Sequence, residues 1–235
     1  IPDTVTEIGG SAFSACKQLS TVQLSNNLTK LGECAFSDCT SLTSIRIPKS
    51  LETAAYWYGG PFAGCLALQT AELETGMTRI PDNLFSACSG LKTITIPDTV
   101  TEIGSDAFSR SNLSSIVIPD TVTEIGNDVF SGCTELKDVT LPNIRKNIVA
   151  GMFENCTSLE KIVLPETVTA IRSDAFKGCT ALKDITWSKA LETIESRAFQ
   201  NCSALTDVTI PDSVKSIGYG VFSDCSALSA VTLPD

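Results

Sequence analysis

The sequence predicts a β-rich solenoid, in which short coils stack into one elongated domain spanning residues 1–235. The first observation is a repeat: all ten phenylalanines recur at one phase of a unit of about 23 residues. The second is an alternation of apolar and polar residues within each unit, which is typical of a strand with one buried face. A coil of this length cannot bury its apolar side alone, so it depends on its neighbours in the stack.

Each unit contains one clear strand. Residues 91–97 read Leu-x-x-Ile-x-Ile-Pro, which directs Ile94 and Ile96 inward and Thr93 and Thr95 outward. Proline then ends the strand, where the loss of one N–H group costs little. Residues 100–103, Val-Thr-Glu-Ile, predict a second short strand or extended edge on the opposite side of the coil.

A tight helical turn is expected next, beginning at residues 106–108. Two residues after most of the phenylalanines stands a residue type that tolerates positive φ, which predicts a left-handed residue there. The residues that follow this rule are Asp38, Gly64, Gly132, Asn155, Gly178, Asn201 and Asp224. Ala15, Ala87 and Arg110 occupy the same position and depart from the rule.

Nine of the ten cysteines share one inward phase, three residues after the phenylalanine. They are Cys16, Cys39, Cys65, Cys88, Cys133, Cys156, Cys179, Cys202 and Cys225, and only Cys34 lies outside this column. Free cysteine is often buried as a small apolar residue, which we favour here. Disulfides along the column are the alternative, but bridge geometry is narrow.

The order Leu-x-x-Ile-x-Ile at this period falls within the leucine-rich-repeat class. The fuller pattern, Ile-Pro-Asp-x-Val-x-x-Ile-Gly-x-x-Ala-Phe-x-x-Cys, resembles the BspA-like leucine-rich repeats of bacterial and protist surface proteins, and it runs through all ten coils. This resemblance implies a right-handed, curved solenoid with a parallel concave sheet. It also implies a secreted or cell-surface location, an adhesin-like role and no shared catalytic residues.

Composition narrows the function. The chain has 17 basic and 27 acidic residues, a net charge of −10 and no histidine. Nucleic acid is an unfavourable partner for such a chain, and no imidazole is available as a base or metal ligand. No apolar run approaches the roughly 18 to 20 residues that span a bilayer. We therefore expect no catalytic centre, no cofactor and no membrane insertion by these residues.

The strongest candidate contact site lies in the third coil, where three extra residues precede Phe62 and place Tyr56, Trp57 and Tyr58 together. Rigid amphipathic rings are frequent in binding hot spots, and they also stack on sugar rings. Arg46 and Glu72 occupy outward strand positions in the flanking coils. The alternative is that the inserted segment folds back and buries Trp57.

Weaker candidates are the charged outward residues of the later coils, Asp138, Lys161, Asp184 and Asp207. Asp184 and Asp207 occupy equivalent strand positions in adjacent coils about 5 Å apart, so paired carboxylates are possible in principle. The alternative is a solvated face, which Lys161, between Asp138 and Asp184 in the same column, supports. An acidic edge after the strands could bind calcium, although such residues usually shape turns. It consists of Asp98, Asp120, Asn143 and Glu166.

These observations favour a non-enzymatic extracellular recognition or adhesion module with protein or glycan partners. The alternative is a structural spacer in a larger surface protein. Both ends of the chain match the interior of the repeat, as Ile1-Pro2 matches Ile96-Pro97. We therefore expect a segment of a longer protein, and end-to-end self-association of the isolated segment.

Overall fold

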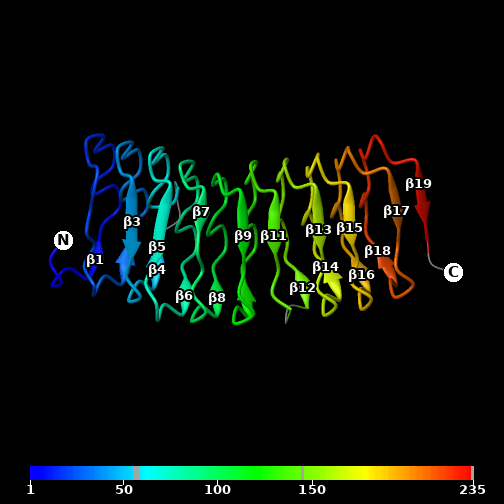
Figure 1. Ribbon diagram of the computed structural model, residues 1–235, viewed down its shortest axis with the longest axis horizontal. Coiled ribbons are helices and arrows are strands. Elements are labelled where there is room, and N and C mark those ends of the chain that lie inside the picture. Colours follow the sequence, from blue (N-terminus) through cyan, green and yellow to red (C-terminus); the bar gives the residue numbers. More distant parts are fainter. Residues whose placement is uncertain (55–58, 144–145, 234–235) are drawn as a thin grey trace.

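A computed structural model of the protein describes residues 1–54, 59–143 and 146–233. The described chain is a parallel-strand β-solenoid of about ten coils, which follow one another along its long axis from the N-terminus to the C-terminus (Figure 1). Within each sheet, a strand pairs with the strand of the next coil in the same register, as Arg46 does with Glu72 and Lys161 with Asp184. Equivalent side chains therefore form columns along the solenoid.

The strands form two series on different sides of the coils. The first series follows the predicted Leu-x-x-Ile-x-Ile positions and forms what we call the first-strand face. It comprises β3 (Ser44–Ile47), β5 (Thr70–Leu73), β7 (Thr93–Ile94), β9 (Ser115–Val117), β11 (Asp138–Thr140), β13 (Lys161–Val163), β15 (Asp184–Thr186), β17 (Asp207–Thr209) and β19 (Ala230–Thr232).

The second series, which forms the second-strand face, contains two-residue strands. These are β1 (Glu7–Ile8), β2 (Lys30–Leu31), β4 (Thr53–Ala54), β6 (Arg79–Ile80), β8 (Glu102–Ile103), β10 (Glu124–Ile125), β12 (Asn147–Ile148), β14 (Ala170–Ile171), β16 (Thr193–Ile194) and β18 (Ser216–Ile217). The predicted second short strand is therefore confirmed.

The pairing within each series is parallel but divided. The first series forms four separate sheets, β3-β5-β7, β9-β11, β13-β15 and β17-β19. The second series forms three, β1-β2-β4, β6-β8-β10 and β12-β14-β16-β18. The breaks after β7, after β15 and after β4 each lie beside unbroken pairing in the other series, whereas both series break between coils six and seven.

The phenylalanines form a continuous ladder through the core. Each ring stacks on the ring of the next coil, with centroids 5.0 to 5.9 Å apart and planes within 23° of parallel. The eight inner rings are fully buried, while Phe13 and Phe222 at the two ends are partly buried. The repeat phase of phenylalanine thus marks the shared core, as the sequence predicts.

The expected helical turn is wrong, because the described residues contain no helix. The backbone turns by short bonds such as Ser109 N–H to Asp106 O (3.1 Å), while the N–H of Phe108 donates to Val129 O in the next coil (3.0 Å). Left-handed residues stand on both sides of the phenylalanine, as Asp106 (φ 54°) and Arg110 (φ 56°) do in the fifth coil. A helix cannot continue through such residues.

The residue two positions after the phenylalanine has positive φ in all ten coils. This holds even for Ala15, Ala87 and Arg110, whose residue types depart from the rule. A second left-handed column, two residues before the phenylalanine, was not predicted. It contains Ser11, Cys34, Asn83, Asp106, Asp128, Gly151, Asp174, Arg197 and Gly220. Cys34, which lies outside the main cysteine column, occupies this second column.

All ten cysteines are free. Eight of the nine column cysteines are buried, but Cys16 is exposed because the first coil has a neighbour on one side only. Seven column thiols donate to the phenylalanine carbonyl of the preceding coil, with Sγ to O distances of 3.1 to 3.2 Å. In the fifth coil, which lacks the cysteine, the buried Ser111 takes this position and its Oγ lies 3.4 Å from Cys133 Sγ.

Candidate functional site

The outward side chains of the first-strand face form two columns, because alternate residues of each strand point to solvent. The first column is Thr21, Ser44, Thr70, Thr93, Ser115, Asp138, Lys161, Asp184, Asp207 and Ala230. The second column is Gln23, Arg46, Glu72, Thr95, Val117, Thr140, Val163, Thr186, Thr209 and Thr232. In coils one to five the first column carries only hydroxyl side chains, which we call the hydroxyl column.

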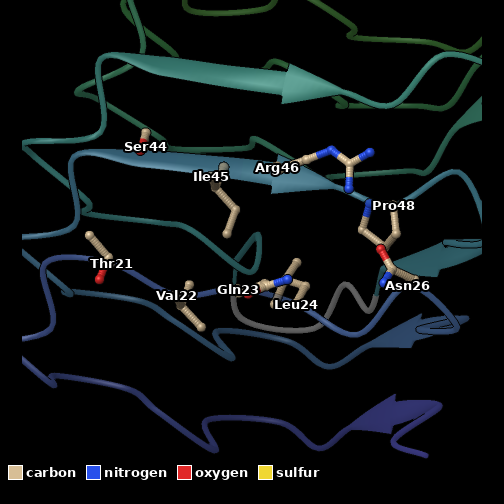
Figure 2. A pocket seen from close by; sticks show the side chains of 9 residues that line it. All are labelled: Thr21, Val22, Gln23, Leu24, Asn26, Ser44, Ile45, Arg46 and Pro48. Atoms are coloured by element: carbon tan, nitrogen blue, oxygen red, sulfur yellow. The ribbon is translucent and has the colours of Figure 1, made fainter. Parts of the chain in front are cut away.

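Four hollows follow one another over coils one to five. Their volumes are about 250, 240, 440 and 370 Å³, and each shares lining residues with the next. Figure 2 shows the first hollow, in which Thr21 and Ser44 lie toward one end and Arg46, Pro48 and Asn26 toward the other. The outward columns of the N-terminal half therefore line a shallow, continuous groove.

Arg46 and Glu72, which the sequence proposes as a pair of flanking contacts, meet in this groove. Arg46 Nε lies 3.4 Å from Glu72 Oε1, and its Nη2 lies 3.1 Å from Glu74 Oε1. Glu74 Oε2 also accepts a hydrogen bond from the backbone N–H of Lys49 (3.0 Å). Because Arg46 and Glu72 are largely exposed, these ion pairs contribute little stability, but they balance the arginine charge with two carboxylates.

Tyr56, Trp57 and Tyr58 lie outside the described residues, so their role as a contact site stays a prediction. The segment that carries them begins after β4 and ends before Gly59. Arg46 on β3 belongs to the coil before this insertion, and Glu72 on β5 belongs to the coil that contains it. Both side chains line the second hollow.

The weaker candidates occupy the first column where the hydroxyl column ends. Lys161 is paired in register with Asp184, and Asp138 with Ser115. The proposed carboxylate pair is not formed across a sheet, because β15 and β17 belong to separate sheets. Asp207 instead pairs in register with Ala230, and its carboxylate accepts a hydrogen bond from Ser229 Oγ (3.4 Å).

The acidic edge after the strands serves as a set of caps between coils. Asp120 Oδ1 accepts the backbone N–H of Asn143 (2.8 Å), and Glu166 Oε2 accepts that of Lys189 (3.2 Å). In the described part of the chain, no group of three or more cysteine or carboxylate side chains is placed to hold a metal ion. The turn chemistry favoured over calcium is thus observed for these two residues.

Two exposed apolar residues of the face were missed from the sequence. Val117 and Val163 point to solvent with 63% and 60% exposure, in the second outward column. The two-residue alternation that identifies Thr95 and Thr140 also identifies them, so the signal was present. They make the later part of this column a row of valine and threonine side chains.

Comparisons with known proteins agree with this architecture. A family model described as the BspA type leucine rich repeat region matches residues 1–58, 58–182 and 146–235, with six copies. No curated protein is similar enough to match the chain. Within the described residues, no helix has the length and apolar character needed to cross a membrane.

Three solved structures share the fold. A leucine-rich repeat protein from Bacteroides ovatus is 26% identical, with a TM-score of 0.75 over 98% of this chain and 71% of that one. A leucine-rich repeat protein from Eubacterium ventriosum is 22% identical, with a TM-score of 0.62 over 94% and 80% of the two chains. The pneumococcal vaccine antigen PcpA is 21% identical, with a TM-score of 0.62 over 100% of this chain and 61% of that one.

Proposed function

Because the chain belongs to the BspA-type leucine-rich-repeat family, we propose that it is a non-enzymatic recognition module which presents its first-strand face to a protein or glycan outside the cell. The observation that carries this proposal is the groove over coils one to five. Its four hollows are lined by outward side chains of consecutive coils, and it includes the Arg46–Glu72–Glu74 network. A rigid stack of coils keeps such a surface preorganised for binding.

The non-enzymatic part of the proposal is supported by the chemistry of the side chains. The sequence has no histidine, and Asp184 and Asp207 do not face each other across a strand pair. The buried column thiols are held as donors to phenylalanine carbonyls, as Cys156 is with Phe130. These groups stabilise the solenoid, so we assign them no catalytic role.

The extracellular or cell-surface location is proposed from the family, because the repeat pattern of this chain resembles that of bacterial and protist surface proteins. The free state of the cysteines does not oppose it, because eight of them are enclosed in the core rather than placed at the surface.

The second candidate function is a structural spacer, in which the coils set the reach of a larger protein. It is favoured by the uniform second column of the later coils, where Thr140, Val163, Thr186, Thr209 and Thr232 repeat short β-branched side chains. Such side chains stabilise strands and leave an exposed sheet surface without distinctive contact groups.

An array of extracellular proteins and glycans, probed with the 235-residue chain, distinguishes the two functions. A recognition module should give saturable binding that falls by about 2 kcal/mol in Trp57→Ala and also falls in the Arg46→Ala/Glu72→Ala double variant. Thr186→Ala, on the plain part of the same face, should change binding by less than about 0.5 kcal/mol. Melting curves must first show that each variant is folded.

Equal, small effects in all three variants would favour the spacer, as would an array without a saturable partner. If binding is lost only in the Arg46→Ala/Glu72→Ala variant, the groove is the recognition site and the aromatic segment is not part of it.

A further inference from the structure

The hydroxyl column presents five exposed side chains, one on each of five consecutive coils. They are Thr21, Ser44, Thr70, Thr93 and Ser115. Ser44, Thr70 and Thr93 are paired in strict strand register, so neighbouring hydroxyls are separated by about the 4.8 Å that divides hydrogen-bonded strands. The protein therefore carries a row of hydroxyl groups along the solenoid axis, whose three central members are held in register by strand pairing.

These hydroxyls make no hydrogen bond to the rest of the described chain, unlike the threonines of the opposite side. On the second-strand face, the hydroxyls of Thr29, Thr101 and Thr169 donate to carbonyls of the preceding coil, at 3.1, 3.2 and 3.1 Å. The threonines of the second-strand face thus form hydrogen bonds between coils, whereas the side chains of the hydroxyl column keep their full hydrogen-bonding capacity. That free capacity is what a polar ligand requires.

The four hollows lie along the same row. The hollows are bounded in turn by Thr21 and Ser44, by Ser44 and Thr70, by Thr70 and Thr93, and by Thr93 and Ser115. Each hollow therefore contains one step of the hydroxyl column and opens into the next. A long, narrow ligand with a repeat of one unit for each coil would make the same contacts in every hollow.

The charge of the groove selects against anionic polymers. Its one arginine in the strands, Arg46, is already paired with Glu72 and Glu74, so it offers no free cation to a polyanion. From the sixth coil onward the first column carries charges instead, beginning with Asp138 and Lys161. The neutral part of the column thus lies along the four hollows.

The groove is also poorly suited to a protein partner. Among the described residues that line it, Val22 and Ile94 are partly buried apolar side chains, Val117 is an exposed one, and none is aromatic. Protein interfaces concentrate their binding energy in aromatic and arginine anchors placed in desolvated pockets. Hydroxyl rows with small apolar patches match instead the hydroxyl groups and C–H faces of sugar rings.

From these observations we infer that coils one to five bind a neutral, linear oligosaccharide laid along the solenoid axis, with about one sugar ring for each coil. Each ring of an extended β-1,4-linked chain advances it by roughly the strand spacing of about 4.8 Å, so successive rings would lie over successive coils, with alternate rings turned over to present opposite edges to the hydroxyl column. The inference rests on the proposed recognition function and names the class of its ligand.

Titration calorimetry with β-1,4-linked oligomers of glucose and of N-acetylglucosamine, from two to six rings, tests this. Binding of at least one series should strengthen with each ring and level off at five rings, because five coils carry the hydroxyl column. Hexagalacturonate, a polyanion of similar length, should bind at least about tenfold more weakly than the neutral hexamer.

Matched variants locate the site. Thr70→Val and Thr93→Val keep the shape and strand preference of threonine but remove the hydroxyl, and each should weaken hexamer binding about threefold to tenfold. Thr186→Val and Thr209→Val make the same change on exposed positions of the same face outside the groove, and they should leave binding unchanged.

The inference is overturned if no neutral hexamer binds while the chain still binds a protein on the array, and the proposed recognition function then stands without it. Absence of any partner in either experiment overturns both. Equal losses in Thr93→Val and Thr186→Val, tighter binding of hexagalacturonate, or affinity independent of chain length would also contradict it.

Discussion

Burial controls the chemistry of the cysteine column at the scale of single residues. Desolvation raises the pKa of Cys65, Cys88 and Cys179 to about 12, and that of Cys133 to about 11. The thiolate is the reactive form of cysteine, so these side chains are unreactive at neutral pH. Each of these thiols is both buried and protonated. Those of Cys65, Cys133 and Cys179 also donate a hydrogen bond to the phenylalanine carbonyl of the preceding coil.

Thiol counting with a bulky maleimide at pH 8 checks this. In the native protein we expect two fast sites, Cys16 and Cys34, since these are the cysteines that are not buried. The other eight should react only after denaturation. Fast labelling of more than two sites, or mass mapping that finds disulfides along the column, would contradict this expectation.

Asp128 shows how a carboxylate can oppose folding. Burial raises its pKa above the ordinary value of 3.8, with further increases from the negative charges of Asp106, Glu154 and Asp174. The folded state then binds the proton more tightly than the unfolded state. Stability contributed by this group is therefore present at low pH and is lost as pH rises through the raised pKa.

Asp128→Asn should stabilise the protein at pH 7, because asparagine removes the charge and tolerates the left-handed backbone (φ 57°), as Asn83 does in the fourth coil. We expect the melting temperature to rise by about 1 to 2 °C after allowance for solvent screening. The gain should disappear below about pH 4, where both side chains are neutral. Asp212→Asn, at an exposed position, is the control with the same charge change.

An unchanged or lower melting temperature for Asp128→Asn at pH 7 would show that the aspartate forms a favourable interaction that outweighs its burial. A gain equal to that of Asp212→Asn would assign the effect to net charge rather than to the local cluster.

At the scale of the elements, the turn after each second strand brings two backbones into contact. A Cβ added to Gly126 would lie 2.4 Å from the backbone nitrogen of Ser105 in the preceding coil. Gly9 occupies the same position in the first coil, where no coil precedes it, and a Cβ added there meets nothing within 4 Å. The close contact at Gly126 therefore comes from the preceding coil rather than from the local backbone angle, whereas later coils hold Val149, Arg172 and Glu195 at the equivalent position.

This pair provides a matched test of coil stacking. Gly126→Ala should destabilise the protein by about 1 to 3 kcal/mol, since rigid backbone must move apart. Gly9→Ala should be neutral or stabilise slightly, because alanine reduces the freedom of the unfolded chain. Chemical denaturation of both variants measures the difference. Similar effects at the two positions would mean that the turn itself, and not the neighbouring coil, requires glycine.

At the scale of the whole molecule, the last coil of the 235-residue chain leaves apolar side chains and strand edges uncovered. Ile217, Tyr219, Val231 and Leu233 are exposed there, and β18 and β19 each pair on one side only. At the opposite end, Val5 and Phe13 are only partly buried. Because every coil repeats the same inward positions, the first coil of a second copy has the shape and pattern to stack on the last coil.

We therefore expect end-to-end association of this chain at high concentration, with mass rising steadily in static light scattering. Val231→Lys should reduce it by placing a charge in the contact, since exposed edges are blocked in this way in natural sheets. Val117→Lys, an exposed position far from both ends, should not. A chain that stays strictly monomeric at high concentration would contradict the prediction.

The sequence by itself determined the coil, its period and its core. Phenylalanine, cysteine and alternating isoleucine positions recur once per unit, and identical inward positions can only be buried by stacking, so the parallel solenoid follows from the pattern. The meeting of Arg46 with Glu72 was predictable for the same reason, because equivalent strand positions in adjacent coils pair in register.

Contacts between coils decided what the pattern left open. Ala15, Ala87 and Arg110 adopt the left-handed conformation because each backbone N–H donates at 2.7 Å to the next coil, at Ser37, Ser109 and Ser131, and these bonds outweigh local preference. Thr93 and Thr101 look alike in sequence, yet only Thr101 finds a carbonyl for its hydroxyl. Whether a side chain is used by the fold or left for a ligand depends on the neighbouring coil, which only the tertiary structure supplies.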